Sequence, residues 1–341
     1  MSFKDIKGQD KPIQIIKEYI KNSHLTGSYL FTGEEGIGKK LTAKTLAKAI
    51  NCASGISDSC DKCATCLKIE RDSHPDVYCI NTDDSDSIKI ERIRQMQKAL
   101  NLKSYEGKKK IFIINNAQDL TPDAENALLK ILEEPPPESL IILVSAKPAL
   151  LFKTIISRCK VIKFYPLKKI QLDEILKKDY FLDHSLAHFL AYFCEGSLGR
   201  ALRLIDKDIL REKNRIIDAL ALSGGSVSRD LSSDNNRNNM RSYLNILAGW
   251  FRDMYLVKIG IPDGELINLD RKEQLLMAME RYTWPELDQI LHFVSNSLLY
   301  LEQNVNIKLL LSNLREATTY GAAAMRQANI SCKAELTPHH F

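Results

Sequence analysis

The sequence GEEGIGKK at positions 33–40 lies between the apolar run SYLFT and the helical pattern KKLTAKTLAKAI. A glycine-rich loop that joins a strand to a helix in this way is typical of a phosphate-binding loop, and it predicts an α/β domain. Gly33, Gly36 and Gly38 would let backbone N–H groups approach phosphate oxygens. Lys39 would reach the β- and γ-phosphates of a nucleotide. A glycine-rich turn that binds nothing is the alternative interpretation.

Three positions depart from the pattern that nucleotide hydrolysis requires. The motif G-x-x-x-x-G-K-[ST] ends in a hydroxyl that holds Mg²⁺, and this chain has Lys40 there. Thr42 is no substitute, because two residues along a helix rotate a side chain by roughly 200°. The run IFII is followed by Asn115 and Asn116, where a hydrolytic site would have acids, and Asp119 is expected in the loop or cap beyond. We therefore predict that the loop, with Lys40 among its nucleotide-binding residues, can hold ATP or ADP without hydrolysing the nucleotide.

The distribution of strand and helix patterns predicts three domains and a tail. Five β-rich runs alternate with helical patterns in the first half, which predicts a parallel sheet with flanking helices over residues 1–165: SYLF, DVYCI, KIFIIN, LIILVSA and KVIKFY. Helical patterns alone follow, and they predict a small helical domain over 166–210 and a larger one over 211–328. The polar segment SGGSVSRDLSSDNNRNN lies within the latter, and residues 329–341 are predicted to form a flexible tail.

The apolar runs and the charge limit the class of protein. The longest apolar runs, such as LIILV, are too short to span a bilayer, and no apolar leader follows Met1, so we expect a cytoplasmic protein without a membrane partner. The net charge of +5 permits a nucleic-acid partner without arguing for one. In the cytoplasm the eight cysteines would stay reduced, so a cysteine cluster indicates metal binding rather than disulfides.

Four cysteines have the spacing of a closed metal site. Cys52, Cys60, Cys63 and Cys66 follow the pattern C-x7-C-x2-C-x2-C, in which one tight turn presents three thiolates and the preceding helix end supplies the fourth. Four thiolates without an open position predict a structural Zn²⁺ within a module at about residues 52–66. An iron–sulfur cluster and free thiols are the alternatives.

These motifs together resemble the clamp-loader branch of the AAA+ superfamily. The resemblance covers about the first 210 residues, and beyond them only the helical character agrees with the family's collar domain. It implies an AAA+ α/β module with a zinc-binding insertion, a small helical lid and an all-α oligomerisation collar. The motifs that carry it are GEEGIGKK, the four-cysteine module, HPD at 74–76, NALLKILEEPP at 126–136, SRC at 157–159 and GSLGRAL at 196–202.

The resemblance also implies a role in DNA replication. Such proteins form a pentameric ring of gamma/tau subunits, delta and a further subunit within the DNA polymerase III holoenzyme, a nucleotidyltransferase complex, and the ring loads a sliding clamp onto primed DNA. The family's SRC motif would make Arg158 an arginine finger that acts in trans on a neighbour's ATP. The alternative is an ordinary solvent-exposed arginine on a loop. By the same resemblance Arg200 matches the second nucleotide sensor, Ser145 the first, and Lys130 could face DNA.

The missing hydroxyl and acids decide between kinds of subunit. They favour a subunit without ATPase activity of its own, which would supply Arg158 to an adjacent ATPase. A gamma/tau-like ATPase with an unconventional metal site is the alternative. A zinc-dependent DNA-binding protein that acts alone is the third hypothesis, and the acidic run DDSDSIK near the cysteines argues against it.

Overall fold

The chain folds into two compact units in the computed structural model. The α/β unit comprises Met1–Leu172 with Glu195–Arg200, and the helical unit comprises Asp173–Cys194 with Ala201–Phe341. The structure describes residues 1–22, 25–55, 58–82, 87–219 and 237–302. The predicted tail at 329–341 and most of the polar segment that begins at Ser223 lie outside the described residues. The three predicted domain boundaries stay a prediction.

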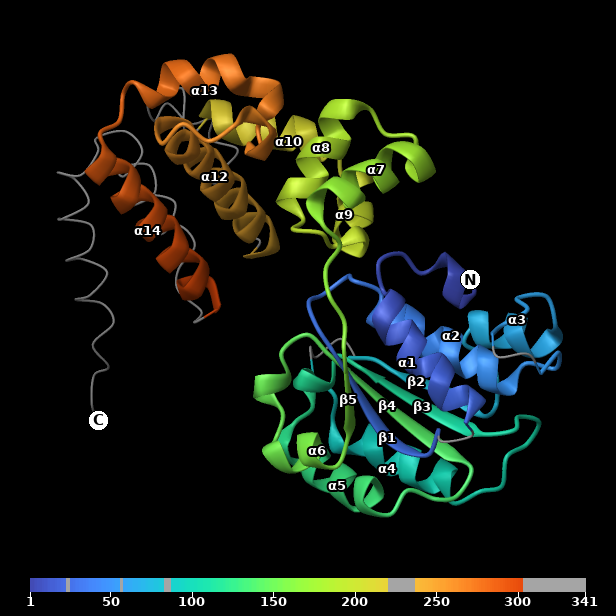
Figure 1. Cartoon of the computed structure of the whole chain (residues 1–341). Coiled ribbons are helices and arrows are strands. Elements are labelled where there is room, and N and C mark those ends of the chain that lie inside the picture. The colour runs from blue at the N-terminus through green and yellow to red at the C-terminus, as the bar shows by residue number, and fades with distance from the viewer. Residues whose placement is uncertain (23–24, 56–57, 83–86, 220–236, 303–341) are drawn as a thin grey trace, which may run out of the picture. The chain divides into compact units, whose positions relative to one another are not determined.

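A five-stranded parallel sheet forms the centre of the α/β unit (Figure 1). Its strand order is β2-β3-β4-β1-β5, so the first strand lies inside the sheet between β4 and β5. Each of the five β-rich runs of the sequence forms one strand, which confirms the predicted fold class. The strands are β1 (Gly27–Thr32), β2 (Val77–Ile80), β3 (Lys110–Asn115), β4 (Ser139–Ser145) and β5 (Lys160–Lys163).

Apolar side chains cover both faces of the sheet, as a parallel sheet with helices on each side requires. In β3, Ile111 and Ile113 pack into one core cluster, whereas Phe112 and Ile114 pack into the other. The first face is covered by η1 (Phe3–Asp5), α1 (Asp10–Lys21), α2 (Lys39–Asn51) and α3 (Ala64–Glu70). The opposite face is covered by α4 (Ile90–Leu100), η2 (Ala117–Asp119), α5 (Pro122–Glu133) and α6 (Lys153–Ser157). The short η3 (Pro148–Leu150) lies between β4 and α6 and has no buried residue.

Helices alone make up the rest of the described chain. Trp250 and Phe251 are fully buried in α12, which packs against α10, α13 and α14. None of the described helices combines the length and the apolarity needed to cross a membrane. The elements are α7 (Lys169–Tyr180), α8 (His184–Phe193), α9 (Leu198–Ile205), α10 (Ile209–Ile217), α12 (Arg237–Lys258), η5 (Asp263–Glu265), η6 (Leu269–Arg271), α13 (Lys272–Met279) and α14 (Trp284–Glu302).

Candidate functional site

The glycine-rich loop joins the end of β1 to the start of α2, at the carboxyl edge of the sheet where α/β folds bind ligands. Gly33 and Gly38 have φ angles of 138° and 99°, a conformation that favours glycine. The Lys39 ammonium donates hydrogen bonds to the carbonyl oxygens of Gly33 and Glu34, and only 6% of Lys39 is exposed. Burial lowers the pKa of Lys39 to about 8, against the opposing charges of Glu35 and Glu34. In this structure Lys39 therefore stabilises its own loop.

The loop is packed against the segment that contains GSLGR. Ser197 Oγ donates to the Glu35 carbonyl oxygen at 2.7 Å, and the Gly199 N–H donates to the Gly36 carbonyl oxygen at 2.8 Å. Gly36 has a φ of +77°, and a Cβ there would lie 2.4 Å from Ser197 Oγ and 2.9 Å from the Arg200 nitrogen. Only glycine fits this position without displacement. The structure thus brings the backbone of Arg200 beside the loop, while the sensor role of its side chain stays a prediction.

An ammonium and two amides gather at the strand ends where a hydrolytic site would hold Mg²⁺. Lys40 Nζ donates to Asn81 Oδ1 at 3.0 Å, and Asn115 Nδ2 lies 3.4 Å from the same oxygen. Asn116 follows with a left-handed φ of 54° and precedes η2. Thr42 Oγ1 donates back to the Gly38 carbonyl oxygen at 2.9 Å, so its hydroxyl is directed at the helix backbone. This group of side chains supplies amides and a positive charge in place of carboxylates.

The residues next to this group have internal partners as well. Ser145, at the end of β4, donates from Oγ to Gln118 Oε1 at 2.8 Å, and the Ala146 N–H reaches the same oxygen at 3.2 Å. Asp119 lies at the end of η2, beyond the end of β3, as the sequence predicted. Sequence reasoning missed Asn81 and Gln118. Asn81 follows β2, and Gln118 lies within η2. Neither belongs to a motif, so only their three-dimensional neighbours identify them.

The four predicted cysteines lie together and fit a metal ion. Their sulfur atoms all lie within 4.8 Å of one another, and the pairs Cys52–Cys63 and Cys60–Cys66 are both 4.0 Å apart. A tetrahedron with metal–sulfur bonds of about 2.3 Å needs sulfur atoms about 3.8 Å apart, so little movement would be required. Backbone N–H groups of Cys63 and Cys66 point at the sulfurs of Cys60 and Cys63, each at 3.4 Å. The cluster can therefore hold a metal ion with four thiolates.

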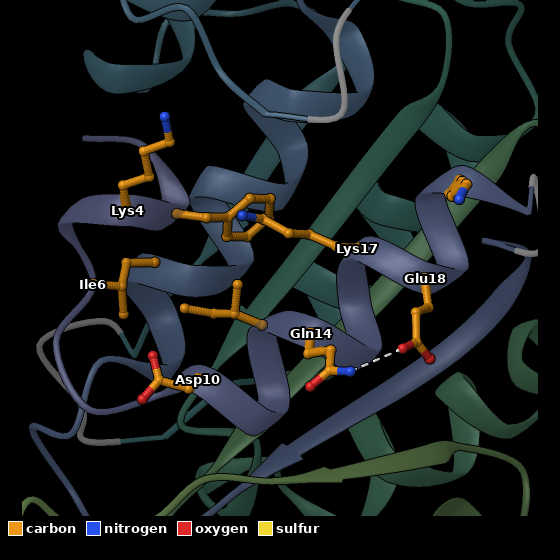
Figure 2. A pocket seen from close by; sticks show the side chains of 9 residues that line it. Lys4, Ile6, Asp10, Gln14, Lys17 and Glu18 are labelled. Carbon is orange, nitrogen blue, oxygen red and sulfur yellow. Dashed lines mark hydrogen bonds between the residues drawn. The ribbon is translucent and has the colours of Figure 1, made fainter.

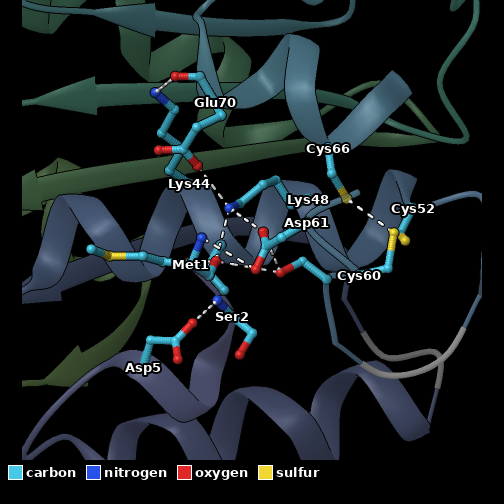
Figure 3. A network of polar contacts seen from close by, with 12 residues as sticks. Met1, Ser2, Asp5, Lys44, Lys48, Cys52, Cys60, Asp61, Cys66 and Glu70 are labelled. Atoms are coloured by element: carbon cyan, nitrogen blue, oxygen red, sulfur yellow. Dashed lines mark hydrogen bonds and ion pairs between the residues drawn. The ribbon is translucent and has the colours of Figure 1, made fainter. Parts of the chain in front are cut away.

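Ion pairs connect the cysteine cluster to the helix that begins at the phosphate loop (Figure 3). Cys52 caps the C-terminus of α2, and Lys48, one turn earlier, is 1% exposed. Its ammonium lies 2.6 Å from Asp61 and 2.8 Å from Glu70. Burial would lower the pKa of Lys48, but the hydrogen bonds to these two carboxylates raise it above the ordinary value. The same helix thus carries the loop at one end and a metal ligand at the other.

The HPD motif has a structural role that its sequence did not reveal. Asp76 is 1% exposed, and its carboxylate accepts hydrogen bonds of 2.8 to 3.0 Å from the backbone N–H groups of Tyr105, Glu106 and Gly107. These bonds lower the pKa of Asp76 although burial acts in the opposite direction. His74 Nδ1 accepts from the Asp76 N–H at 3.1 Å. The motif therefore fixes the turn that leads into β3.

Arg158 of the SRC motif lies at the C-terminal end of α6. Its Nε and Nη2 donate to Glu133 Oε1 at 3.1 and 2.6 Å, and its Nη1 donates to the Thr154 carbonyl oxygen at 2.9 Å. The side chain of Arg158 is 33% exposed. Lys130, on the same helix as Glu133, is also exposed. The contacts of Arg158 are thus on α5 and α6, away from the contacts that Lys39 makes within its own loop.

A hollow of about 460 Å³ lies between η1 and α1 (Figure 2). Lys4, Lys17 and Lys21 line it together with Asp10 and Glu18, so its charges are mixed. The residues that line it include none of the predicted nucleotide, metal or finger residues.

Comparisons with known proteins identify the family. Residues 8–168 match the family described as "DNA polymerase III, delta subunit", and residues 210–315 match "DNA polymerase III, delta subunit, C terminal". DNA polymerase III subunit delta′ of Bacillus subtilis is 28% identical over 316 residues, which cover 90% of this chain and 94% of the relative. The chain belongs to the family of DNA polymerase III clamp-loader subunits. This confirms the resemblance inferred from the motifs, with delta′ as the relative matched over almost its full length.

Gamma and tau subunits of DNA polymerase III match over a shorter part of this chain. DNA polymerase III subunit gamma of Buchnera aphidicola is 33% identical over 219 residues, and subunit tau of Escherichia coli is 33% identical over 214 residues. The matches cover 61% of this chain in both cases, but only 58% and 33% of the two relatives.

Among solved structures, a gamma subunit-related protein of Thermotoga maritima covers 91% of this clamp-loader chain at 17% identity with a TM-score of 0.47. The clamp loader delta protein of Bacillus subtilis covers 90% of the chain at 12% identity with a TM-score of 0.37.

Proposed function

We propose that this chain is a clamp-loader subunit that does not hydrolyse ATP and that supplies Arg158 to the ATP site of an adjacent subunit. The observation that carries the proposal is the chemistry at the carboxyl edge of the sheet. Lys40 and Asn115 both donate to Asn81 where hydrolysis needs a hydroxyl and carboxylates. A subunit without that chemistry contributes to ATP turnover through a group that it presents to a neighbour, and Arg158 is a permanently charged side chain on the surface.

The partners follow from the family. We infer a ring with gamma/tau and delta subunits that opens a sliding clamp and places it on primed DNA, in the cytoplasm. Within it, residues 1–165 would be the nucleotide-binding-like module, 166–210 the lid and 211–328 the collar. ATP or ADP would bind the glycine-rich loop through its backbone and Lys39, which would have to exchange its bonds to Gly33 and Glu34 for bonds to phosphate.

We also propose that the cysteine cluster holds a structural Zn²⁺. The sulfur separations and the backbone N–H groups directed at two of the sulfurs support it. With four protein ligands the ion would have no open position, so its chemistry would be to hold the loop between α2 and α3 together. The residues that would hold it are Cys52, Cys60, Cys63 and Cys66.

The Arg158→Ala variant tests the central proposal. An arginine finger contributes about 10³-fold or more to the rate at the site that it serves, so ATP turnover at the adjacent site in the reconstituted loader should fall by about that factor. Lys153→Ala, which removes an exposed positive charge from the same helix, is the matched control and should have wild-type activity. Near-normal clamp loading and ATPase activity by the assembled Arg158→Ala loader would refute the proposal.

The isolated chain provides a second test. We expect negligible phosphate release from ATP in the presence of Mg²⁺. Lys40, Asn81 and Asn115 supply neither a metal ligand of the usual kind nor a base. Mg²⁺-dependent phosphate release that disappears in Lys39→Ala would instead identify a gamma/tau-like ATPase.

A further inference from the structure

The guanidinium of Arg158 is held from two sides. Glu133 Oε1 accepts from Nε and from Nη2, and the Thr154 carbonyl oxygen accepts from Nη1. Glu133 is the last residue of α5, whereas Thr154 and Arg158 belong to α6 and its C-cap. The side chain of Glu133 is 51% exposed and that of Arg158 is 33% exposed, so the pair is accessible to a partner.

These contacts leave donors for a further anion. A guanidinium has five N–H bonds, and the three hydrogen bonds use one on each nitrogen. Within the part of the chain that the structure describes, one N–H on Nη1 and one on Nη2 remain, and these two nitrogens form the end of the guanidinium that can bind two oxygens of a phosphate. Glu133 therefore restrains the Nε side of Arg158 and keeps its terminal nitrogens able to donate.

The two helices that carry this pair are packed and hydrogen-bonded to each other. Glu125, which is 3% exposed, accepts from the Phe152 N–H at 2.8 Å and so fixes the N-terminal end of α6 on α5. Ile155 of α6 and Leu132 of α5 belong to the same core cluster. α5 thus holds α6 at its start through Glu125 and at its end through Glu133. Because the two helices are fixed to each other in this way, the backbone of Glu133 keeps its position relative to Arg158.

We propose that Glu133 is a positioning residue for Arg158, holding the guanidinium in the orientation in which it meets the phosphates of a neighbouring subunit's nucleotide. This inference rests on the proposed function of Arg158. Immobilising a side chain such as arginine costs about 0.5 to 1.5 kcal/mol of free energy. If the side chain must be ordered anew at each turnover, this corresponds to a factor of about 2 to 10 in rate. Glu133 would lower this free-energy cost, because it orients the Arg158 side chain before the subunits meet.

The test uses the reconstituted loader with a substitution in this chain only. Glu133→Ala should lower kcat for ATP by about 2- to 10-fold and leave KM unchanged, because Arg158 would be oriented only during turnover. Glu133→Gln should retain most of the activity, since its amide oxygen can still accept from Nε and Nη2. Glu134→Ala is the matched control, because it removes the adjacent carboxylate, and it should match the wild type.

Two further measurements separate positioning through Arg158 from a general structural effect. In the Arg158→Ala background, Glu133→Ala should cause no additional loss of kcat, because the two residues act as one unit. In the isolated ¹⁵N-labelled chain, Arg158 Nε should become more mobile in Glu133→Ala and stay as in the wild type in Glu134→Ala.

The outcomes distinguish the inference from the proposed function. If Arg158→Ala lowers turnover but Glu133→Ala leaves it unchanged or raises it, Glu133 does not position the finger and the inference is wrong. A loss from Glu133→Ala that persists undiminished without Arg158 would also overturn it. If Arg158→Ala itself has wild-type turnover, the proposed function fails and the inference fails with it.

Discussion

The buried carboxylate of Asp76 offers a direct test of how the α/β unit is held together. Its Oδ2 accepts from the N–H groups of Glu106 and Gly107 at 2.8 Å, and its Oδ1 accepts from Tyr105 at 2.8 Å. In Asp76→Asn the amide oxygen can take the place of Oδ2 and keep the bonds from Glu106 and Gly107, but an NH₂ group would then face the Tyr105 N–H. The Tyr105 N–H would lose its short bond and meet a second donor, so we expect a loss of about 1 to 3 kcal/mol.

Amide hydrogen exchange measures this loss where it occurs. Both tryptophans, Trp250 and Trp284, lie in α12 and α14, so their fluorescence reports on the helical unit rather than on the turn at residues 105–107. A loss of at least 1 kcal/mol predicts exchange at the turn that is faster by about 5-fold or more, with the peptide over 240–258 unchanged. Asp72→Asn, which removes a more exposed carboxylate paired with Lys44, is the control and should leave exchange at the turn almost unchanged.

The stabilisation by the Asp76 carboxylate should be lost as the pH falls. The backbone hydrogen bonds lower the folded-state pKa of Asp76 below its ordinary value of 3.8. Its contribution to stability is therefore fully present above the unfolded pKa and is lost as the pH falls through the folded pKa. The difference in exchange between the wild type and Asp76→Asn should be largest near pH 7 and should shrink below pH 3.8. Equal exchange at the turn in both proteins at pH 7 would refute the role assigned to Asp76.

Two further predictions concern the metal module and the loop. Cys60→Ser should abolish stoichiometric zinc binding, which elemental analysis of the purified chain measures, and the control Cys159→Ser should retain it. A full zinc content in Cys60→Ser would contradict the four-thiolate site. Gly36→Ala should destabilise the α/β unit by about 1 to 3 kcal/mol, because it forces a left-handed residue against Ser197, and exchange of the loop amides measures this. Gly264→Ala, where a Cβ would meet nothing within 4 Å, is its control, and equal protection of the loop in both variants would count against this packing.

The order and type of the elements were predictable because the sheet is buried on both faces and its strands are short apolar runs separated by helical patterns. The chemistry of the site was predictable for a different reason. The presence of Lys40 after Lys39, of Asn115 and Asn116 after an apolar run, and of four cysteines at close spacing is a property of the chain itself. Whatever the fold, these positions themselves carry neither a hydroxyl nor a carboxylate.

Contacts between residues far apart along the chain were decided by the tertiary structure alone. Asn81 meets Lys40 across 41 residues, Asp76 reaches the turn about 30 residues later, and Glu133 reaches Arg158 across 25. No helix or strand period relates these positions, because each pair meets only after strands and helices have packed side by side. The sequence by itself thus determined which groups the site contains and which it lacks. The packing of the α/β unit decided what each group touches, and so how Lys39, Lys40 and Arg158 are held.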